Sequence, residues 1–142
     1  MGPGRPPAAL ALALLALLAV VAGGCASAAS RVTPAALLAS IDAGTPPVIV
    51  DVRTRREYDA GHVPGALHVP FYTLLVGRDR LPASPEQAPA LPIVVYCQHG
   101  PRAGVAWAAL RLAGYTNVRY LDGHMAGWIA AGLPREPPAA AR

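Results

Sequence analysis

The sequence predicts one α/β domain in which helices flank a central, mostly parallel sheet. A further strand is expected at 118–121, and two short runs, 48–52 and 93–96, are rich in β-branched residues and lack the alternation of a half-exposed strand. Such runs are typical of strands that are buried on both faces, as in a parallel sheet. Segments with helical signals separate the runs, and strands that alternate with helices over this length indicate a single α/β domain.

The first element is expected to be a helix. Thr33 is a suitable N-cap, Pro34 fits the first helical position, and Gly44 closes the helix. Two prolines then break the chain before the strand at 48–52. The remaining expected elements, in chain order, are a short helix at 53–60, a short strand at 66–69, a proline-rich connection at 74–92, a strand at 93–96, a helix at 102–113 with Val105, Ala109 and Leu112 on one apolar face, a strand at 118–121 and a helix at 124–131.

The first 25 residues have the features of a signal peptide. Arg5 is the only charge before a run of about fifteen Ala, Leu and Val residues, and that run is shorter than the roughly twenty apolar residues of a membrane-spanning helix. The stretch AGGC, ending at Cys25, resembles a bacterial lipobox, which predicts lipidation of Cys25 and attachment to a membrane. Cleavage near 26–28 is the alternative and would leave a soluble secreted protein. Either way we expect export to the periplasm or cell envelope.

The rest of the chain is long enough for one domain with a modest core. We expect a linker at 26–32, the domain at 33–136 and a flexible tail at 137–142. The formal net charge is +4, all positive side chains are arginines, and acidic residues are interspersed with them. This distribution does not form a basic face, so we expect no binding of nucleic acid. The oligomeric state is left open.

Cys97 is the strongest candidate for chemistry. It directly follows the strand at 93–96 and precedes a helix, and ligands of parallel sheets bind at the carboxyl ends of strands. Gly100 permits a tight turn, Pro101 fixes a dihedral, and Arg102 adds a positive charge. Backbone N–H groups in such a turn form a concavity that favours thiolate over thiol and can hold an anion.

Two other interpretations of Cys97 stay open at this point. A lone cysteine after an apolar strand is often an inert part of the core. Cys97 and His99 could also be two metal ligands, but no second pair lies nearby in the sequence, so we expect no metal. If Cys25 is lipidated or removed, Cys97 has no partner for an internal disulfide.

Four ordered stretches carry a resemblance to the rhodanese (sulfurtransferase) homology domain. They are DVR to EY at 51–58, GHVPGA at 61–66, CQHGPRA at 97–103 and LDG to GLP at 121–134. The resemblance implies a three-layer α/β domain whose cysteine, Cys97, takes a sulfane sulfur from an anionic donor such as thiosulfate. The cysteine then carries the sulfur as a persulfide and passes it to cyanide or a thiol, with no cofactor. The substrate-binding residues that it implies are Gln98, His99, Gly100, Pro101 and Arg102.

The resemblance leaves two rival functions. Related phosphatase-type domains place their arginine one residue further on, which makes a wider cradle for phosphate or arsenate. Four residues separate Cys97 from Arg102 here, so sulfur transfer is favoured. The other rival is a non-catalytic module of the same fold that carries sulfur or serves as a redox partner.

The remaining matched residues are expected to be structural. We expect Asp51 to hydrogen-bond neighbouring backbone, Arg53 to form an ion pair with Glu57, and His62 to order its turn. His124 stands where the family usually has a glycine. If that position needs a positive φ, His124 is strained.

Overall fold

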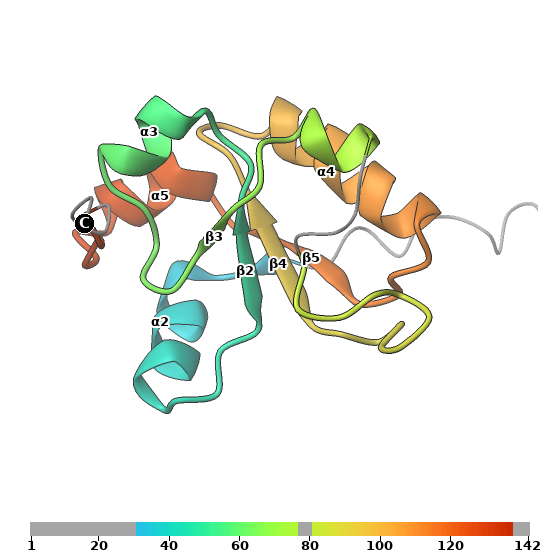
Figure 1. The fold of residues 1–142 in the computed structure, drawn as a ribbon. Helices are drawn as coiled ribbons and strands as arrows, with labels where there is room; N and C mark the ends of the chain where they lie inside the picture. The colour runs from blue at the N-terminus through green and yellow to red at the C-terminus, as the bar shows by residue number, and fades with distance from the viewer. Residues whose placement is uncertain (1–30, 77–80, 138–142) are drawn as a thin grey trace, which may run out of the picture.

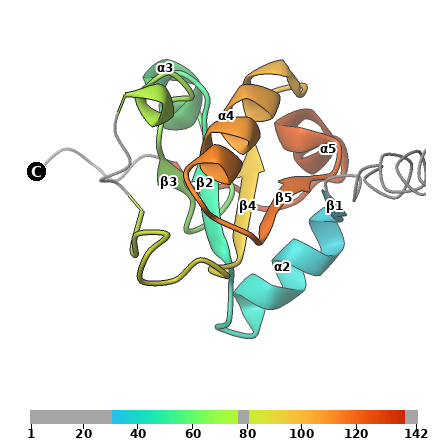
Figure 2. The same ribbon diagram turned by 90° about the vertical axis from the view of Figure 1, so that its right-hand side faces the viewer.

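Five strands form the centre of the structure, a computed structural model that describes residues 31–76 and 81–137 (Figure 1). Each neighbouring pair of strands runs parallel, in the order β1-β5-β4-β2-β3. Figure 2 shows this order from one edge of the sheet to the other. The strands are β1 (Arg31–Val32), β2 (Val48–Asp51), β3 (Leu67–His68), β4 (Ile93–Tyr96) and β5 (Val118–Leu121).

Four α-helices and one short 3-10 helix accompany the sheet. They are α2 (Pro34–Asp42), α3 (Arg55–Asp59), η1 (Thr73–Leu75), α4 (Pro101–Leu112) and α5 (His124–Ala130). Within the described ranges, none of these helices has the length and apolar character that crossing a bilayer requires. The predicted signal peptide, Cys25 and residues 138–142 of the predicted tail lie outside the described residues.

Helices cover both faces of the sheet, which confirms the predicted three-layer α/β class (Figure 1). Successive residues of β4 point to opposite faces, as in any strand. Val95 packs with α4 residues in one buried cluster, whereas Val94 packs with residues of α2 and α5 in the other. Burial on both faces explains why the sequence of β4 is apolar without alternation.

The helix boundaries follow from local capping. Thr33 accepts a hydrogen bond from the Ala36 N–H at 3.2 Å, and Pro34 opens α2 as predicted. Thr54 and Glu57 form a capping box at the start of α3, in which the Thr54 N–H and hydroxyl both donate to the Glu57 carboxylate. This box holds the Glu57 side chain back against the beginning of its own helix.

Two expectations about the elements are wrong. Arg31 and Val32, assigned to a linker, form the edge strand β1, because the Asp122 N–H donates to the Val32 carbonyl at 2.8 Å beside β5. The apolar face of α4 is also misplaced, because Val105 and Leu112 are exposed. The buried residues of α4 are Ala103, Ala106 and Leu110.

A buried ion pair lies at the carboxyl end of β2. Arg53 donates to the fully buried Asp51 carboxylate through Nη2 at 2.7 Å and Nε at 3.0 Å, and its backbone N–H donates to the same group at 2.9 Å. The Tyr96 hydroxyl donates to Asp51 at 2.8 Å. The predicted contact of Asp51 with neighbouring backbone is thus confirmed. The predicted Arg53–Glu57 pair is wrong, because the Arg53 guanidinium binds Asp51 instead.

This cluster also ties together distant segments. Arg53 Nη2 donates to the Gly61 carbonyl at 2.8 Å, and the Tyr96 hydroxyl accepts the Val63 N–H at 3.1 Å. Burial alone would lower the pKa of Arg53, but the hydrogen bonds and charge of Asp51 outweigh it, so the pKa is raised. The ion pair therefore joins β2, the turn before β3 and the end of β4.

We expect Asp51→Asn to lower the free energy of unfolding by about 3–5 kcal/mol, because it leaves the Arg53 charge buried without a counter-charge. The matched control is Asp59→Asn, which removes the exposed partner of Arg55 four residues away and should cost far less, since exposed ion pairs contribute little. Urea unfolding of the two variants measures both losses. Equal losses would show that the buried pair is not a major source of stability.

Candidate functional site

Cys97 lies at the carboxyl end of β4, in a short loop that runs into α4. Its Sγ accepts a hydrogen bond from the Gly100 N–H at 2.9 Å. The residue is only 1% exposed and belongs to the core cluster beneath α4. The side chain is thus buried, as a core cysteine would be, but its sulfur faces a backbone donor at the start of a helix, which favours a negative charge on sulfur.

The loop is held in place from the other side by α5. The Met125 N–H donates to the Cys97 carbonyl at 3.0 Å, and the Ala126 N–H donates to the Gln98 carbonyl at 3.2 Å. These are N–H groups of the first helical turn, which have no partner within their own helix. These contacts hold the carbonyl groups of the loop in place. The directions of the loop N–H groups are therefore also set before a substrate binds.

Gly100 occupies a position that only glycine fits well. Its φ is +132°, a value that side chains rarely adopt, and an added Cβ would lie 3.3 Å from Nε2 of His124. Pro101, the first residue of α4, has no N–H group. Pro101 therefore starts the helix and adds no N–H donor to the cradle.

The two other predicted loop side chains, those of Gln98 and His99, contact Arg53 and solvent respectively. The Gln98 Oε1 accepts from Nη1 of Arg53 at 3.3 Å, which links the loop to the buried ion pair. His99 is exposed. Neither side chain has a hydrogen bond with Cys97 among the described contacts.

Arg102 is engaged by Glu57. Its Nη1 donates to Glu57 Oε2 at 2.6 Å and its Nη2 donates to Oε1 at 2.7 Å, so both terminal nitrogens are used. Hydrogen bonds from Arg102 hold the pKa of Glu57 far below its usual range, and Thr54 contributes in the same direction. The pKa of Arg102 is raised chiefly by these bonds, and the nearby charge of Glu57 adds to the effect. The sequence places Glu57 correctly in a short helix but assigns it the wrong arginine.

His124 is strained and buried behind the loop. Its φ is +53°, the only positive value at a non-glycine among the described residues, which confirms the strain expected there. The residue is 8% exposed, and its Nδ1 has no hydrogen-bond partner in the described part of the protein. Burial lowers the pKa of His124, and the charge of Arg31 adds to this effect. His124 therefore packs against Gly100 as a neutral ring.

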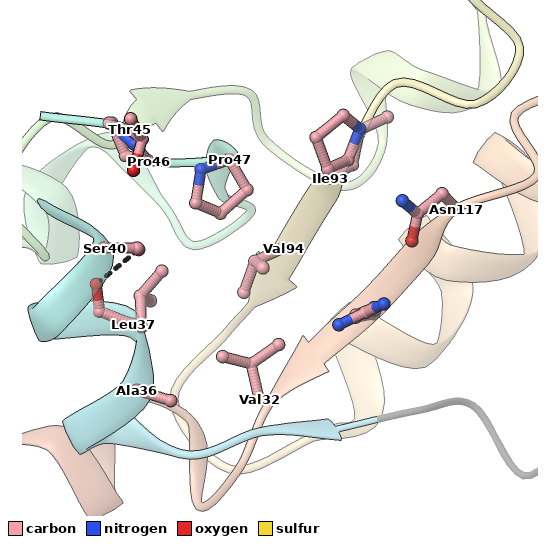
Figure 3. A pocket seen from close by; sticks show the side chains of 12 residues that line it. Val32, Ala36, Leu37, Ser40, Thr45, Pro46, Pro47, Ile93, Val94 and Asn117 are labelled. Carbon is pink, nitrogen blue, oxygen red and sulfur yellow. Dashed lines mark hydrogen bonds between the residues drawn. The ribbon is translucent and has the colours of Figure 1, made fainter. Parts of the chain in front are cut away.

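The described residues line a pocket on either side of the Cys97 strand, among others. One of about 540 Å³ flanks the Cys97 loop and is lined by Arg31, His99, Gly100, Gly104, Tyr120, Asp122, Gly123 and His124. The other, of about 360 Å³, lies between α2 and the sheet and is mostly apolar near Leu37 and Val94 (Figure 3). It includes Ile93 at the start of β4, so it lies toward the amino ends of the strands, whereas Cys97 lies at the carboxyl end of β4.

The remaining histidines are structural. His62 stacks on Tyr58 with ring centroids 3.7 Å apart, and its Nδ1 contacts the Tyr58 carbonyl at 3.0 Å. These contacts order its turn, as expected. His68 Nε2 contacts the Arg53 carbonyl at 2.9 Å. Across residues 31–76 and 81–137, no group of three or more His, Cys, Asp or Glu side chains is arranged to hold a metal.

Comparisons with known proteins agree with this geometry. The Rhodanese-like domain family matches residues 33–131. A sulfurtransferase of Allochromatium vinosum is 32% identical over 91 residues, which are 64% of this chain and 79% of that protein. The probable adenylyltransferase/sulfurtransferase MoeZ of Mycobacterium tuberculosis is 34% identical over 111 residues, which are 77% of this chain and 27% of MoeZ. The chain thus spans only about a quarter of the length of MoeZ.

A solved structure gives the same result for the fold. The crystal structure of the Alr3790 protein from Anabaena sp. superposes with a TM-score of 0.65 at 33% sequence identity. The superposition covers 75% of this chain and 82% of that one.

The strain at His124 can be isolated with two substitutions. Both His124→Gly and His124→Ala remove the unpaired imidazole, but only glycine adopts a positive φ without a steric penalty. We expect His124→Gly to be more stable than His124→Ala by about 1 kcal/mol in chemical unfolding. If the alanine variant is equally stable, the backbone at residue 124 is not strained.

The Glu57–Arg102 pair predicts a pH dependence of stability. The pKa of Glu57 is lower in the folded protein than the value of about 4.3 expected in the unfolded chain. The pair's contribution is therefore fully present above pH ~4.3 and is lost as the pH falls below it. We expect the free energy of unfolding of the wild type to exceed that of Glu57→Gln by only about 1 kcal/mol at pH 7, because both side chains of the pair are partly exposed. This difference in stability should disappear as the pH falls toward ~2.

The control for this pH effect is the same substitution in an Arg102→Gln background, where no counter-charge remains. There the loss of stability caused by Glu57→Gln at pH 7 should be clearly smaller, because only the hydrogen bonds from Thr54 still favour the charged Glu57 side chain. A loss that persists unchanged at low pH, or that is equally large without Arg102, would contradict the assignment of the effect to the ion pair.

Proposed function

The chain belongs to the rhodanese-like domain family, and we propose that it is a sulfurtransferase that carries sulfane sulfur as a persulfide on Cys97. The observation that carries the proposal is the 2.9 Å hydrogen bond from the Gly100 N–H to Sγ of Cys97. A backbone donor aimed at this sulfur stabilises negative charge there, both on the thiolate and on the inner sulfur of the persulfide as its bond to the transferred sulfur breaks.

The proposed reaction has two displacements at sulfur. The Cys97 thiolate attacks the outer sulfur of thiosulfate, a new S–S bond forms on Cys97, and sulfite leaves with the electron pair of the broken bond. A nucleophilic acceptor, cyanide or a thiolate, then attacks the outer sulfur of the persulfide and regenerates the Cys97 thiolate. Each step conserves charge and needs no external oxidant, reductant or cofactor.

The size of the loop supports sulfur transfer over phosphate chemistry. Arg102 follows Cys97 after four residues, and Gly100 already closes on the sulfur within hydrogen-bond distance. Arg102 itself is bound on both terminal nitrogens by a carboxylate. A phosphate ester would need that guanidinium, so this arrangement disfavours a phosphatase or arsenate reductase.

We further propose that the protein acts outside the cytoplasm. The proposal rests on the apolar segment after Arg5 and on the AGGC stretch, which suit export and lipidation of Cys25. Five residues separate Cys25 from Arg31. A lipid on Cys25 would therefore hold the sulfur-carrying domain within roughly 20 Å of the membrane surface, given the reach of an extended chain.

Persulfide formation can be tested directly by mass. After treatment of the purified protein with thiosulfate, we expect an added mass of one sulfur atom that cyanide removes. Cys97→Ser should abolish the added mass and the production of thiocyanate. The matched control is Cys25→Ser in the same full chain, which changes the other cysteine and should keep both.

The rival function predicts a different pattern. A non-catalytic carrier would take up one sulfur on Cys97 and give at most one thiocyanate per protein molecule. An enzyme produces many. Full sulfur transfer by Cys97→Ser would rule out the proposed mechanism.

A further inference from the structure

We propose that Glu57 selects the sulfur donor: by neutralising Arg102 beside the Cys97 loop, it disfavours a small dianionic donor and favours a persulfide carried on a thiol. The inference rests on the proposed function, and it names the class of donor for that site. The loop alone does not predict this preference for a thiol persulfide. If Arg102 were unpaired, its positive charge would favour the dianionic donor instead.

The carboxylate of Glu57 is fixed rather than mobile. The Thr54 N–H and the Thr54 hydroxyl donate to its Oε2 at 3.0 and 2.6 Å, and Arg102 binds both of its oxygens. A capping box thus holds the carboxylate in the position where it meets the guanidinium. An anion that enters the loop must compete with a preformed, bidentate partner for the same nitrogens.

The other arginines near the site are neutralised as well. Arg53 is paired with the buried Asp51 at 2.7 Å. Arg31, which lines the pocket beside the loop, is paired with Asp122 at 3.4 Å. For the described residues, each arginine at the loop or its flanking pocket therefore has its own carboxylate.

What remains to bind a donor is a set of backbone dipoles. The Gly100 N–H and the start of α4 can stabilise one negative charge on the transferred sulfur. Thiosulfate brings two charges, and the second resides on a sulfonate group that no unpaired cation among the described residues of this region would meet. A thiol persulfide carries its charge on the sulfur that is transferred, so it suits this site better.

The proposed step with such a donor is balanced. The Cys97 thiolate attacks the outer sulfur of R–S–S⁻, forms Cys97–S–S⁻, and breaks the S–S bond of the donor. The donor leaves as R–S⁻ with the electron pair of that bond. One thiolate is consumed and one is released, so no further reactant is needed.

The test compares two donors on two variants. Glu57→Gln removes the charge and keeps the length of the side chain. Asp59→Asn removes an equal charge from the same helix, but from a residue paired with Arg55 and not with Arg102. The donors are thiosulfate and the persulfide of 2-mercaptoethanol, both below saturation. The measured quantity is the rate at which Cys97 gains one sulfur, by intact mass.

We expect Glu57→Gln to raise the thiosulfate rate about fivefold or more and to change the persulfide rate less than about twofold, because one full charge near the site acts mainly on the dianion. This gain in the thiosulfate rate should shrink as the salt concentration is raised toward ~1 M, because salt screens the attraction between Arg102 and the donor. Asp59→Asn should leave the ratio of the two rates unchanged. This ratio is insensitive to partial unfolding, since lost protein lowers both rates equally.

Two results would overturn the inference. One is an unchanged donor ratio in Glu57→Gln. The other is a fall in the thiosulfate rate, which would make Glu57 a positioning residue that holds Arg102 ready for the donor. Failure of the proposed function looks different, because then neither donor loads Cys97 in the wild-type protein.

Discussion

The buried carboxylate of Asp51 is the constraint on which the site depends. It lies at the end of β2 and accepts hydrogen bonds from Arg53 and from the Tyr96 hydroxyl. Tyr96 directly precedes Cys97, and Arg53 also reaches Gln98 in the loop. A buried charge must be paired, so these partners have little freedom to move. One anion therefore aligns two neighbouring strands and the beginning of the loop that follows the second.

The loop itself is built mainly from backbone. Carbonyls of Cys97 and Gln98 are held by the first turn of α5, and Gly100 turns its N–H toward the sulfur. His124 packs against Gly100 in a conformation that favours glycine. Strain of this kind persists only where the surroundings impose it. The nearby charges cancel in pairs, so the electrostatic character of the site comes from peptide dipoles more than from ionised side chains.

Much of this could be predicted from the sequence where the signals are local. Thr33 and Pro34 mark a helix start, undiluted β-branched runs mark buried strands, and Cys97 with Gly100 and Arg102 marks a loop at a strand end. The two residues of β1 could not be predicted, since a strand that short has no periodic pattern. The buried face of α4 was misidentified for a similar reason: it consists largely of alanine, while larger apolar residues face solvent.

The ion pairs were predicted less well because tertiary contacts decide them. Arg53 and Glu57 are four residues apart, the spacing of a helical pair, but Arg53 lies before the N-cap Thr54 and outside the helix. The sequence Thr54-x-x-Glu57 does contain a capping-box signal that directs Glu57 back toward its N-cap. That signal could have excluded Arg53 as its partner. It could not have identified Arg102, which is 45 residues away.

The most direct test of the central claim is a crystal structure of the protein after loading with sulfur. The account predicts one additional sulfur atom bonded to Sγ of Cys97, held within hydrogen-bond distance of loop N–H groups including that of Gly100. An unmodified thiol in a protein that has been shown to transfer sulfur, or an added sulfur on any other residue, would contradict it.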